Sequence, residues 1–301
     1  MTEGRRGFLM GLGAYSLWGL FPLYWPFLEP AGALEILAHR VVWSAVVMAV
    51  LVLLVRRTAE LRRALTSPRT VVLMAAASAV IGANWGLFIW GVNNDHVIET
   101  SLGYFINPLV TVVLGVVVLG ERLRPVQWAS LGLAAVAVTA LTVDYGRPPW
   151  LALALAGSFG AYGLIKKTAG VGAVAGLTVE TVLLAPVALG FLVVLADQGE
   201  GHFTGHGVDH ALLLTTTGIV TAVPLLLFGG AAARIPLSTL GLLQYLTPSI
   251  QFLLGLLVFG EPMPATRWIG FILIWTALVL FTLESLRQHR LTRLRVEASA
   301  C

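Results

Sequence analysis

The sequence predicts an all-α integral membrane protein with ten transmembrane helices, arranged as two inverted repeats of five helices with both termini on the cytoplasmic side. Three observations support this prediction. The composition is too apolar for a protein whose surface faces water, the apolar residues are gathered into ten long runs, and the second half of the chain repeats part of the first.

The composition indicates that most of the surface faces lipid. Of the 301 residues, 57% are hydrophobic and 11% are charged, whereas soluble domains carry about 25% charged residues. The mean hydropathy is +0.87. The one cysteine, Cys301, excludes a disulfide framework and a metal site built on cysteines, and we expect no cofactor and no metal.

Apolar runs of the length that crosses a hydrocarbon core of ~30 Å occur ten times. Because backbone groups in lipid must satisfy their hydrogen bonds within the segment, runs this long are expected to be helices. The expected spans are 7–25, 34–55, 70–90, 97–119, 126–143, 149–165, 173–196, 210–228, 237–259 and 267–285.

The basic residues predict the orientation. With ten spans, sixteen of the 19 Lys and Arg residues fall on one side, Arg147 and Arg267 on the other, and Arg40 within a span. Positive charge stays on the cytoplasmic side, so both termini are expected inside and the protein in the cell (inner) membrane. The basic pI near 9.6 is thereby explained without nucleic-acid binding, and we expect no nucleic-acid partner.

An internal repeat divides the chain. "FINPLVTVVLGVVVLGERLRPVQW" (105–128) and "YLTPSIQFLLGLLVFGEPMPATRW" (245–268) share a Pro, two Gly, a Glu and a Trp at one offset of 140 residues. "AYSLWGL" (14–20) resembles "SFGAYGL" (158–164) more weakly. We therefore expect two five-helix halves, 1–146 and 147–301. Because five is odd, the second half enters the membrane from the opposite side, as in many secondary transporters.

These segments carry a family resemblance over the whole chain. The "GE" followed by Trp after the fourth and ninth spans is typical of the drug/metabolite transporter superfamily, and the two repeats resemble its EamA-type transporters. "LAHRVVWS" (37–44), "NWGLFIWGVNN" (84–94) and "SLGYFINPL" (101–109) closely resemble the RarD branch. The resemblance implies a ten-helix exporter or permease of the inner membrane, with its path between the two halves.

Matched polar stripes predict the substrate path. Thr100, Tyr104, Asn107 and Thr111 lie at i, i+4, i+7 and i+11, which is one face of a helix. The same positions in the second half are Leu240, Gln244, Thr247 and Gln251. Pro108 and Pro248 follow Asn107 and Thr247, and prolines at matching places in two halves indicate broken helices at a midplane site. We expect the stripes to face each other across one cleft; the alternative is that they bind helix to helix.

Ionisable and aromatic residues add candidates to this path. Charged groups inside a membrane are rare unless they face a cavity or a partner, which makes Glu99, His39, Arg40 and Glu180 candidates for proton coupling or for the substrate's charge. Arg40 either reaches the outer headgroups or pairs with Glu35, Glu99 or a substrate carboxylate, and Glu180 alternatively bonds a neighbouring Ser or Thr. Asn84, Trp18, Trp85 and Tyr162 are expected to complete the walls of the path, although Trp85 also suits the interfacial belt.

Two further groups have plainer explanations. His202, His206 and His210 have a four-residue spacing that hints at a metal, but they lie in a Gly-rich loop with no cysteine. Glu121 and Glu261 are expected to fix the geometry of the repeat rather than to touch substrate.

The function expected is secondary active transport of a small amphipathic metabolite or drug by alternating access, coupled to protons. No GxxxxGK[ST] phosphate loop is present, so ATP-driven pumping is not expected. The alternatives are a passive facilitator of the same topology and, less favoured, a lipid-modifying enzyme, for which no catalytic cluster is visible. We therefore expect a transporter and not an enzyme. The sequence leaves the oligomeric state open.

Overall fold

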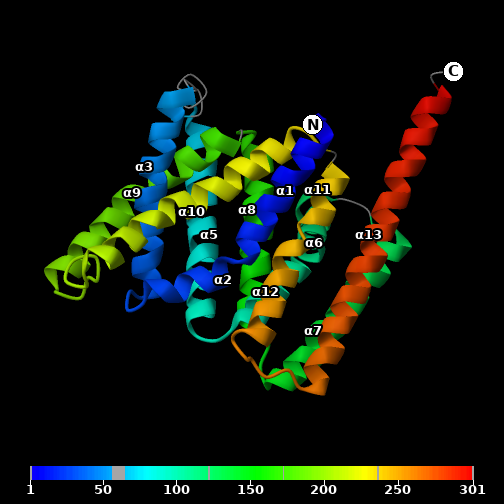
Figure 1. The fold of residues 1–301 in the computed structure, drawn as a ribbon. Helices are drawn as coiled ribbons and strands as arrows, with labels where there is room; N and C mark the ends of the chain where they lie inside the picture. The colour runs from blue at the N-terminus through cyan, green and yellow to red at the C-terminus, as the bar shows by residue number, and fades with distance from the viewer. Residues whose placement is uncertain (1, 56–64, 121–122, 172, 236, 300–301) are drawn as a thin grey trace.

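The computed structural model describes residues 2–55, 65–120, 123–171, 173–235 and 237–299, and the regular secondary structure in these ranges is helical. The helices are α1 (Glu3–Gly19), α2 (Phe21–Tyr24), the 3-10 helix η1 (Trp25–Leu28), α3 (Ala33–Val55), α5 (Pro68–Asn93), α6 (Val97–Leu119), α7 (Pro125–Tyr145), α8 (Trp150–Ala169), α9 (Ala173–Asp197), α10 (Val208–Ala232), α11 (Leu237–Leu243), α12 (Leu246–Leu257) and α13 (Ala265–Ser299). They form one bundle, and both chain ends lie at the same end of it (Figure 1).

Each apolar run expected from the sequence coincides with a helix or with consecutive helices. Seven helices in the described ranges are long and apolar enough to cross a membrane: α3, α5, α6, α7, α9, α10 and α13. The apolar parts of α8 and α12 are shorter. The all-helical prediction is therefore confirmed for the described chain.

The helix ends follow local chemistry. The side chains of Thr2 and Ser67 accept hydrogen bonds from the amides three residues on, and so begin α1 and α5. Gly120, Gly146 and Gly170 take left-handed φ values at the ends of α6, α7 and α8, where a side chain would be strained.

The first expected span is bent rather than straight. The sequence predicts one helix over 7–25, but α1 ends at Gly19 and the chain continues through α2 and η1. Pro22 and Pro26 lie in the first two positions of α2 and η1. Proline lacks an N–H and disfavours a helical residue before it, so the two prolines divide the run into short helices.

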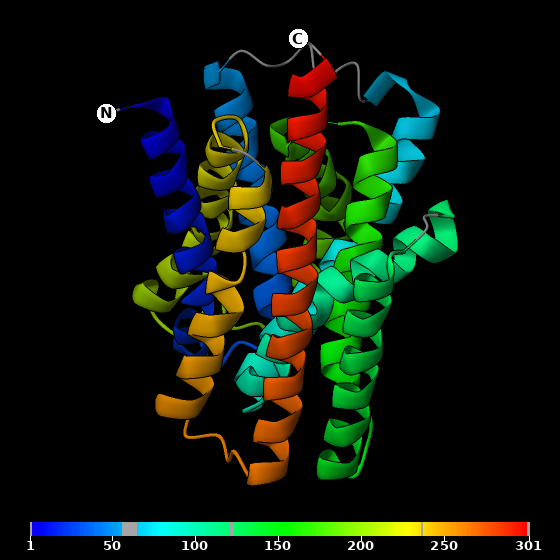
Figure 2. The same ribbon diagram turned by 90° about the vertical axis from the view of Figure 1, so that its right-hand side faces the viewer.

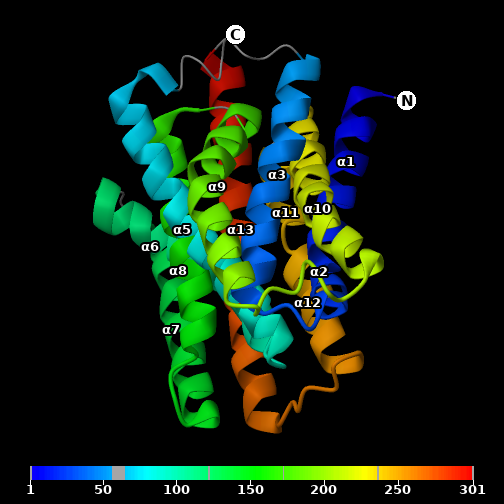
Figure 3. The same cartoon turned by 90° about the vertical axis from the view of Figure 1, so that its left-hand side faces the viewer.

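The most extensive packing joins helices of the first half to helices of the second half. The pairs are α7 with α13, α6 with α8 and α12, α3 with α9 and α10, α5 with α8 and α9, and α1 with α10 and α12. Figure 2 shows α13 beside α7, and Figure 3 shows α9 and α10 beside α3. Packing within each half is less extensive.

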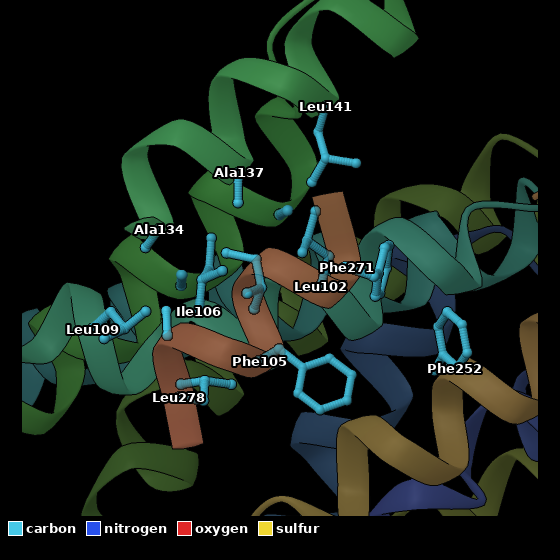
Figure 4. Close-up of a cluster of buried hydrophobic side chains, with 14 of the residues drawn as sticks. Leu102, Phe105, Ile106, Leu109, Ala134, Ala137, Leu141, Phe252, Phe271 and Leu278 are labelled. Atoms are coloured by element: carbon cyan, nitrogen blue, oxygen red, sulfur yellow. The ribbon is translucent and has the colours of Figure 1, made fainter. Parts of the chain in front are cut away.

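Two buried apolar clusters hold these pairs together. In the first, Leu102, Phe105 and Ile106 of α6 pack with side chains of α7, α12 and α13, among them Phe252 and Phe271 (Figure 4). The second lies around Trp25 and joins η1, α3 and α5 to α8 and α10. Burial of apolar side chains is worth roughly 1.5–3 kcal/mol each in water, but α-helices in lipid are held mainly by close packing and hydrogen bonds.

Candidate functional site

Arg40 lies inside the bundle in a setting built by four elements. Its side chain is 4% exposed, and its Nε donates a hydrogen bond to Oγ1 of Thr221 on α10, at 2.9 Å. The guanidinium carbon lies 4.1 Å from the ring centre of Trp85 on α5, 5.2 Å from that of Trp25 on η1 and 5.7 Å from that of Phe21 on α2. The charge is therefore held by aromatic faces and one hydroxyl.

The sequence led us to expect that Arg40 either reaches the lipid headgroups or pairs with Glu35 or Glu99, and both expectations are wrong. A buried side chain does not reach the headgroups, and the two carboxylates expected as partners are engaged elsewhere. Glu35 binds His202 at 2.7 Å, and Glu99 binds Arg147 at 3.0 Å. Each contact of a cation with an aromatic face is worth about 0.5–2 kcal/mol, so the three rings stabilise the charge in place of a carboxylate.

Asn84 connects three helices beside this arginine. Its Nδ2 donates to the carbonyl oxygen of Leu155 at 3.0 Å and to Oγ of Ser158 at 2.9 Å, both on α8. Its Oδ1 accepts from the hydroxyl of Tyr104 on α6, at 3.5 Å. Because Trp85 follows Asn84 in α5, Asn84, Trp85, Tyr104 and Arg40 form one polar and aromatic region between the halves.

Farther along α6, the predicted helix break is absent. The helix runs on through Pro108, since proline removes one backbone donor and the remaining turns are intact. Thr111 donates to the carbonyl oxygen of Asn107 at 2.9 Å. Oδ1 of Asn107 is buried and has no hydrogen-bond partner, so this amide is available to a ligand or a water molecule.

In the ninth span the break lies before the predicted position. α11 ends at Leu243 and α12 begins at Leu246, so Gln244 lies in the turn. Pro248 lies in the first turn of α12, where helix amides need no partner within the helix. A proline is tolerated there, and the interruption falls upstream of it.

The second stripe is turned toward α1. Thr247 donates to the carbonyl oxygen of Tyr15 at 2.8 Å, and Nε2 of Gln251 donates to that of Trp18 at 3.2 Å. Oε1 of Gln251 is buried and has no partner. The expectation that the two stripes face each other is therefore wrong for these side chains. They bind helix to helix, as the alternative held.

The first stripe is turned toward α8, which corresponds to α1 in the repeat. Tyr104 packs edge-on against Phe159 at 6.3 Å. A Cβ placed on Gly160 would lie 3.5 Å from Oγ1 of Thr111. Each polar stripe thus faces the first helix of the other half.

Tyr162 and Glu180 meet in a separate buried group. Tyr162 and Lys166 lie one turn apart on α8, and both reach Glu180 on α9. The tyrosine hydroxyl donates at 3.2 Å and Nζ of Lys166 at 2.8 Å. Glu180 is 1% exposed. Its partners are therefore a lysine and a tyrosine, not the Ser or Thr of the alternative.

Glu99 joins α6 to the loop before α8 and to the first turn of α8. Besides Arg147, it accepts a hydrogen bond from the amide of Leu151 in the first turn of α8, at 3.1 Å. It is 2% exposed, so it does not stand open at a mouth.

His39 is also covered. Its ring stacks on Phe203 at 4.9 Å, and its Nε2 is buried without a partner. The loop that carries Phe203 is held by the bond between His202 and Glu35. The rings of His202, His206 and His210 lie near one another, but within the described ranges no group of three His, Cys, Asp or Glu residues is placed to hold a metal.

Several residues of these groups were not predicted: Thr221, Phe21, Trp25, Ser158 and Lys166. Lys166 stands four residues after Tyr162, a spacing that puts both on one helix face, and that signal was available. Thr221 and Ser158 lie far from Arg40 and Asn84 in sequence, and Phe21 and Trp25 lie in the two short helices before α3. In all four cases the packing, not the sequence pattern, decides the contact.

Comparison with known proteins identifies the family. The model of the EamA-like transporter family matches residues 5–143. A RarD protein of Streptomyces exfoliatus is 56% identical over 299 residues, which cover 99% of this chain and 95% of that protein. The chain belongs to the EamA-like transporter family. RarD of Escherichia coli strain K12 is 43% identical over 96% of this chain and 98% of its own length, which places the chain in the RarD branch.

Other relatives agree with this assignment. A protein of Vibrio cholerae described as an uncharacterized transporter is 44% identical over 97% of this chain and 96% of its own length. One solved crystal structure, 20% identical, matches with a TM-score of 0.59 over 94% of this chain and 98% of that one. At that identity the likeness is one of fold alone. With the apolar helices, the family identifies a multi-pass membrane transporter.

Proposed function

We propose that the chain is a secondary active transporter that moves a small amphipathic metabolite or drug across the inner membrane by alternating access. Its ten helices form two inverted five-helix repeats, 1–146 and 147–301, with both termini cytoplasmic. The observation that carries this proposal is the way the helices pair.

The helix pairing has the symmetry of a two-repeat transporter. If the halves are exchanged, α1, α3, α5, α6 and α7 correspond to α8, α9, α10, α12 and α13. The packing of α1 on α10 and α12 then corresponds to that of α8 on α5 and α6. α3 with α9, α6 with α12 and α7 with α13 each map onto themselves. Matching interfaces of this kind allow the two halves to exchange conformations, which alternating access requires.

Backbone geometry supports the same correspondence. Gly120 and Gly260, paired at the offset of 140, have left-handed φ values of 67° and 64°. Glu261, next to Gly260, accepts hydrogen bonds from the amides of Val97 and Ile98 at the start of α6. The carboxylate thus joins the loop after α12 in one repeat to the fourth helix of the other. Its counterpart Glu121 lies outside the described residues.

We place the substrate path between the halves. One wall is the region of Asn84, Trp85 and Tyr104, and Asn107 and Gln251 lie deeper with unpartnered oxygens. Trp18, Gln244 and Thr111 complete the proposed path, whereas Thr247 and Tyr162 are engaged with Tyr15 and Glu180. Buried amide oxygens without partners are costly, at roughly 1–3 kcal/mol each, and a polar solute passing between the halves would satisfy them.

Counterflow in proteoliposomes tests the transport function. A panel of radiolabelled metabolites and antibiotics is screened for saturable exchange against the unlabelled compound. We expect exchange with at least one compound, strongly reduced by Asn107→Ala and by Gln244→Ala. Gln198→Ala, on an exposed loop, is the control and should exchange normally. Normal exchange by both path variants would show that the path is misplaced, and flux without counterflow would indicate a passive facilitator.

Proton coupling is assigned to the buried ionisable groups, with Glu180 foremost. Glu180 is placed between Tyr162 and Lys166, so a change of its protonation would break or restore an ion pair between α8 and α9. Uptake driven by an imposed pH gradient is measured for the parent and for Glu180→Gln and Glu99→Gln. We expect the gradient to accelerate transport in the parent and Glu180→Gln to remove the acceleration. Transport indifferent to the gradient would refute the coupling.

A further inference from the structure

We propose that Arg40 is the binding site for a carboxylate group, and that the transported solute is an organic anion with an apolar or aromatic body. The assignment of this ligand as the transported solute rests on the proposed function. The binding site itself rests on the charges and hydrogen bonds around Arg40.

The buried charges in the described part of the chain are paired, with Arg40 as the exception. Carboxylates that are buried or largely covered are held by basic side chains or by backbone amides: Glu35 by His202, Glu99 by Arg147, Asp144 by Arg267, Glu180 by Lys166, Glu284 by Arg124, and Glu261 by the amides that begin α6. Arg40 is equally buried but has no carboxylate partner among the described residues. A buried charge is ordinarily paired, so Arg40 is the buried charge of the described residues that is suited to take an anionic partner from outside the chain.

Hydrogen-bond donors around Arg40 exceed acceptors. A guanidinium carries five N–H donors, and the one bond that Arg40 makes to a described residue uses Nε. The indole Nε1 of Trp25, whose ring centre lies 5.2 Å from the guanidinium carbon, is buried without a partner. Oγ of Ser44, one turn along α3, is also buried and unpartnered. A site with this excess of donors fits a ligand group that accepts hydrogen bonds and donates none.

The geometry favours a carboxylate over other acceptors. The terminal nitrogens of a guanidinium form a planar fork that matches the two oxygens of a carboxylate. Nε is already fixed by Thr221, which leaves the fork oriented and free to bind. The faces of Phe21, Trp25 and Trp85 surround the same group and would pack on the apolar body of the ligand.

The charge pattern also distinguishes anions from zwitterions. An amino acid would require a free carboxylate for its ammonium group. The buried carboxylates of the described chain are engaged, so an ammonium group brought to Arg40 would have no partner there. A carboxylate without an amine is therefore the class that the site fits.

Equilibrium binding of three isosteric probes tests this inference. Purified protein in nanodiscs is titrated with benzoate, benzamide and benzylamine, and tryptophan fluorescence is followed because Trp25 and Trp85 flank the guanidinium. We expect saturable binding of benzoate at least tenfold tighter than that of benzamide, since a hydrogen bond to a charged partner is stronger than a neutral one, and weaker binding still of benzylamine. Equal affinities for benzoate and benzamide would overturn the proposal.

Variants locate the binding. Arg40→Gln should reduce benzoate affinity at least tenfold and leave benzamide unchanged, Arg40→Lys should retain part of it, and Arg69→Gln, on an exposed helix end, should bind as the parent does. Thermal unfolding of Arg40→Gln is measured first, because the substitution also removes the ring contacts of the guanidinium. If Arg40→Gln does not fold, Thr221→Val, which frees Nε, takes its place with an expected loss of two- to tenfold. Benzoate affinity unchanged in Arg40→Gln, or in Thr221→Val where it replaces Arg40→Gln, would overturn the proposal.

The binding assay is independent of transport. A parent protein that binds benzoate at Arg40 but shows no counterflow with any compound would refute the transporter and leave the site standing. Counterflow that Arg40→Gln leaves intact for every transported compound, with benzoate no better bound than benzamide, would refute the site and leave the transporter standing.

Discussion

At the scale of single residues, several polar side chains inside the bundle are held by partners that come from the other half of the chain. Asn84 binds α8, Thr247 and Gln251 bind carbonyls of α1, and Glu99 binds the start of α8. These bonds cross the interface along which the halves would move. Side chains with an unsatisfied atom, such as Gln251 and Asn107, are then suited to exchange a protein partner for a solute.

The ion pair of Glu180 and Lys166 gives a prediction about stability. Lys166→Met leaves a buried carboxylate without its charge partner, and the expected loss is about 3–5 kcal/mol. The double variant Lys166→Met with Glu180→Gln should recover most of it, because both charges are then gone. Thermal unfolding in detergent measures both.

The pair formed by the partly exposed Arg234 and the exposed Glu3 is the control. The two side chains lie 2.8 Å apart, but Glu3 is largely exposed, and surface pairs contribute about 0–1 kcal/mol. Arg234→Met should therefore change the midpoint little. A loss in Lys166→Met no larger than in Arg234→Met would contradict the buried-pair interpretation.

The sequence identified the polar positions in the membrane better than it identified their partners. Arg40, Glu99 and Glu180 are recognisable because a charge in an apolar run is rare. Their partners Thr221 and Arg147 depend on how segments far apart in sequence pack, whereas Lys166 lies in α8, the helix directly before the one that carries Glu180. Glu35 shows the limit: it stands five residues before Arg40, yet its carboxylate binds His202 on the 198–207 loop.

At the scale of elements, the start of α6 depends on a carboxylate from the loop after α12. Burial raises the pKa of Glu261 above its ordinary value of 4.5, while the amides of Ile98 and Val97 lower it in part. A carboxyl group with a raised pKa in the folded state favours folding below its unfolded pKa, and this contribution is lost as the pH rises through the folded pKa.

The raised pKa of Glu261 predicts how Glu261→Gln changes the dependence of stability on pH. Gln keeps an acceptor for the two amides but does not ionise, so the variant should gain stability relative to the parent as the pH rises from about 4 to 8. The difference in thermal midpoint between the two proteins is measured across this range. A difference that stays constant, or that changes in the opposite sense, would contradict the raised pKa.

The contact between α3 and α10 gives a prediction about packing. A Cβ on Gly218 would lie 2.5 Å from the carbonyl carbon and oxygen of Trp43. Backbone atoms cannot turn aside, so the two helices would have to separate. Gly218→Ala should cost about 1–3 kcal/mol.

A glycine in open space provides the control for this substitution. Nothing lies within 4 Å of a Cβ on Gly190 in α9, so Gly190→Ala should be neutral or stabilise by up to about 1 kcal/mol through helix propensity. The thermal midpoint should therefore fall in Gly218→Ala and stay unchanged or rise in Gly190→Ala. Equal effects would show that α3 and α10 are not in close contact at Gly218.

Element boundaries were predictable where apolar length alone decides them. α3, α6 and α9 coincide with their expected spans to within about two residues, because an apolar run of this length has no alternative to a helix in lipid. Breaks were less predictable. Pro22 and Pro26 divide the first span, while Pro108 lies inside an unbroken helix, since the effect of a proline depends on its position within the helix and on the packing around it.

At the scale of the whole molecule, the repeat in the sequence and the pairing of the helices point to the same two-part design. The offset of 140 residues aligned Gly120 with Gly260, and both have the same left-handed backbone. What the offset did not predict is which helix each polar stripe faces. Similarity between two segments indicates that they are built alike, not that they touch each other.

The inverted arrangement predicts on which side of the membrane corresponding loops lie. The loop between α5 and α6 should be outside and its counterpart between α10 and α11 inside, because the second half of the proposed arrangement enters from the other face. Cys301 is the one cysteine of the chain, so Cys301→Ser provides a background for single-cysteine variants. Asn94 and Ala233 are exposed in these two loops and are the positions to replace.

In intact cells, a membrane-impermeant maleimide should label the Asn94→Cys protein and not the Ala233→Cys protein, and permeabilised cells should label both. Leu65→Cys, after α3, and Glu200→Cys, after α9, repeat the comparison. In intact cells the maleimide should label the Glu200→Cys protein and not the Leu65→Cys protein. Because each pair holds equivalent positions of the two halves, parallel repeats would give the same labelling within a pair. Labelling of Asn94→Cys together with Ala233→Cys in intact cells would therefore refute the inverted repeat and leave the helical fold unchanged.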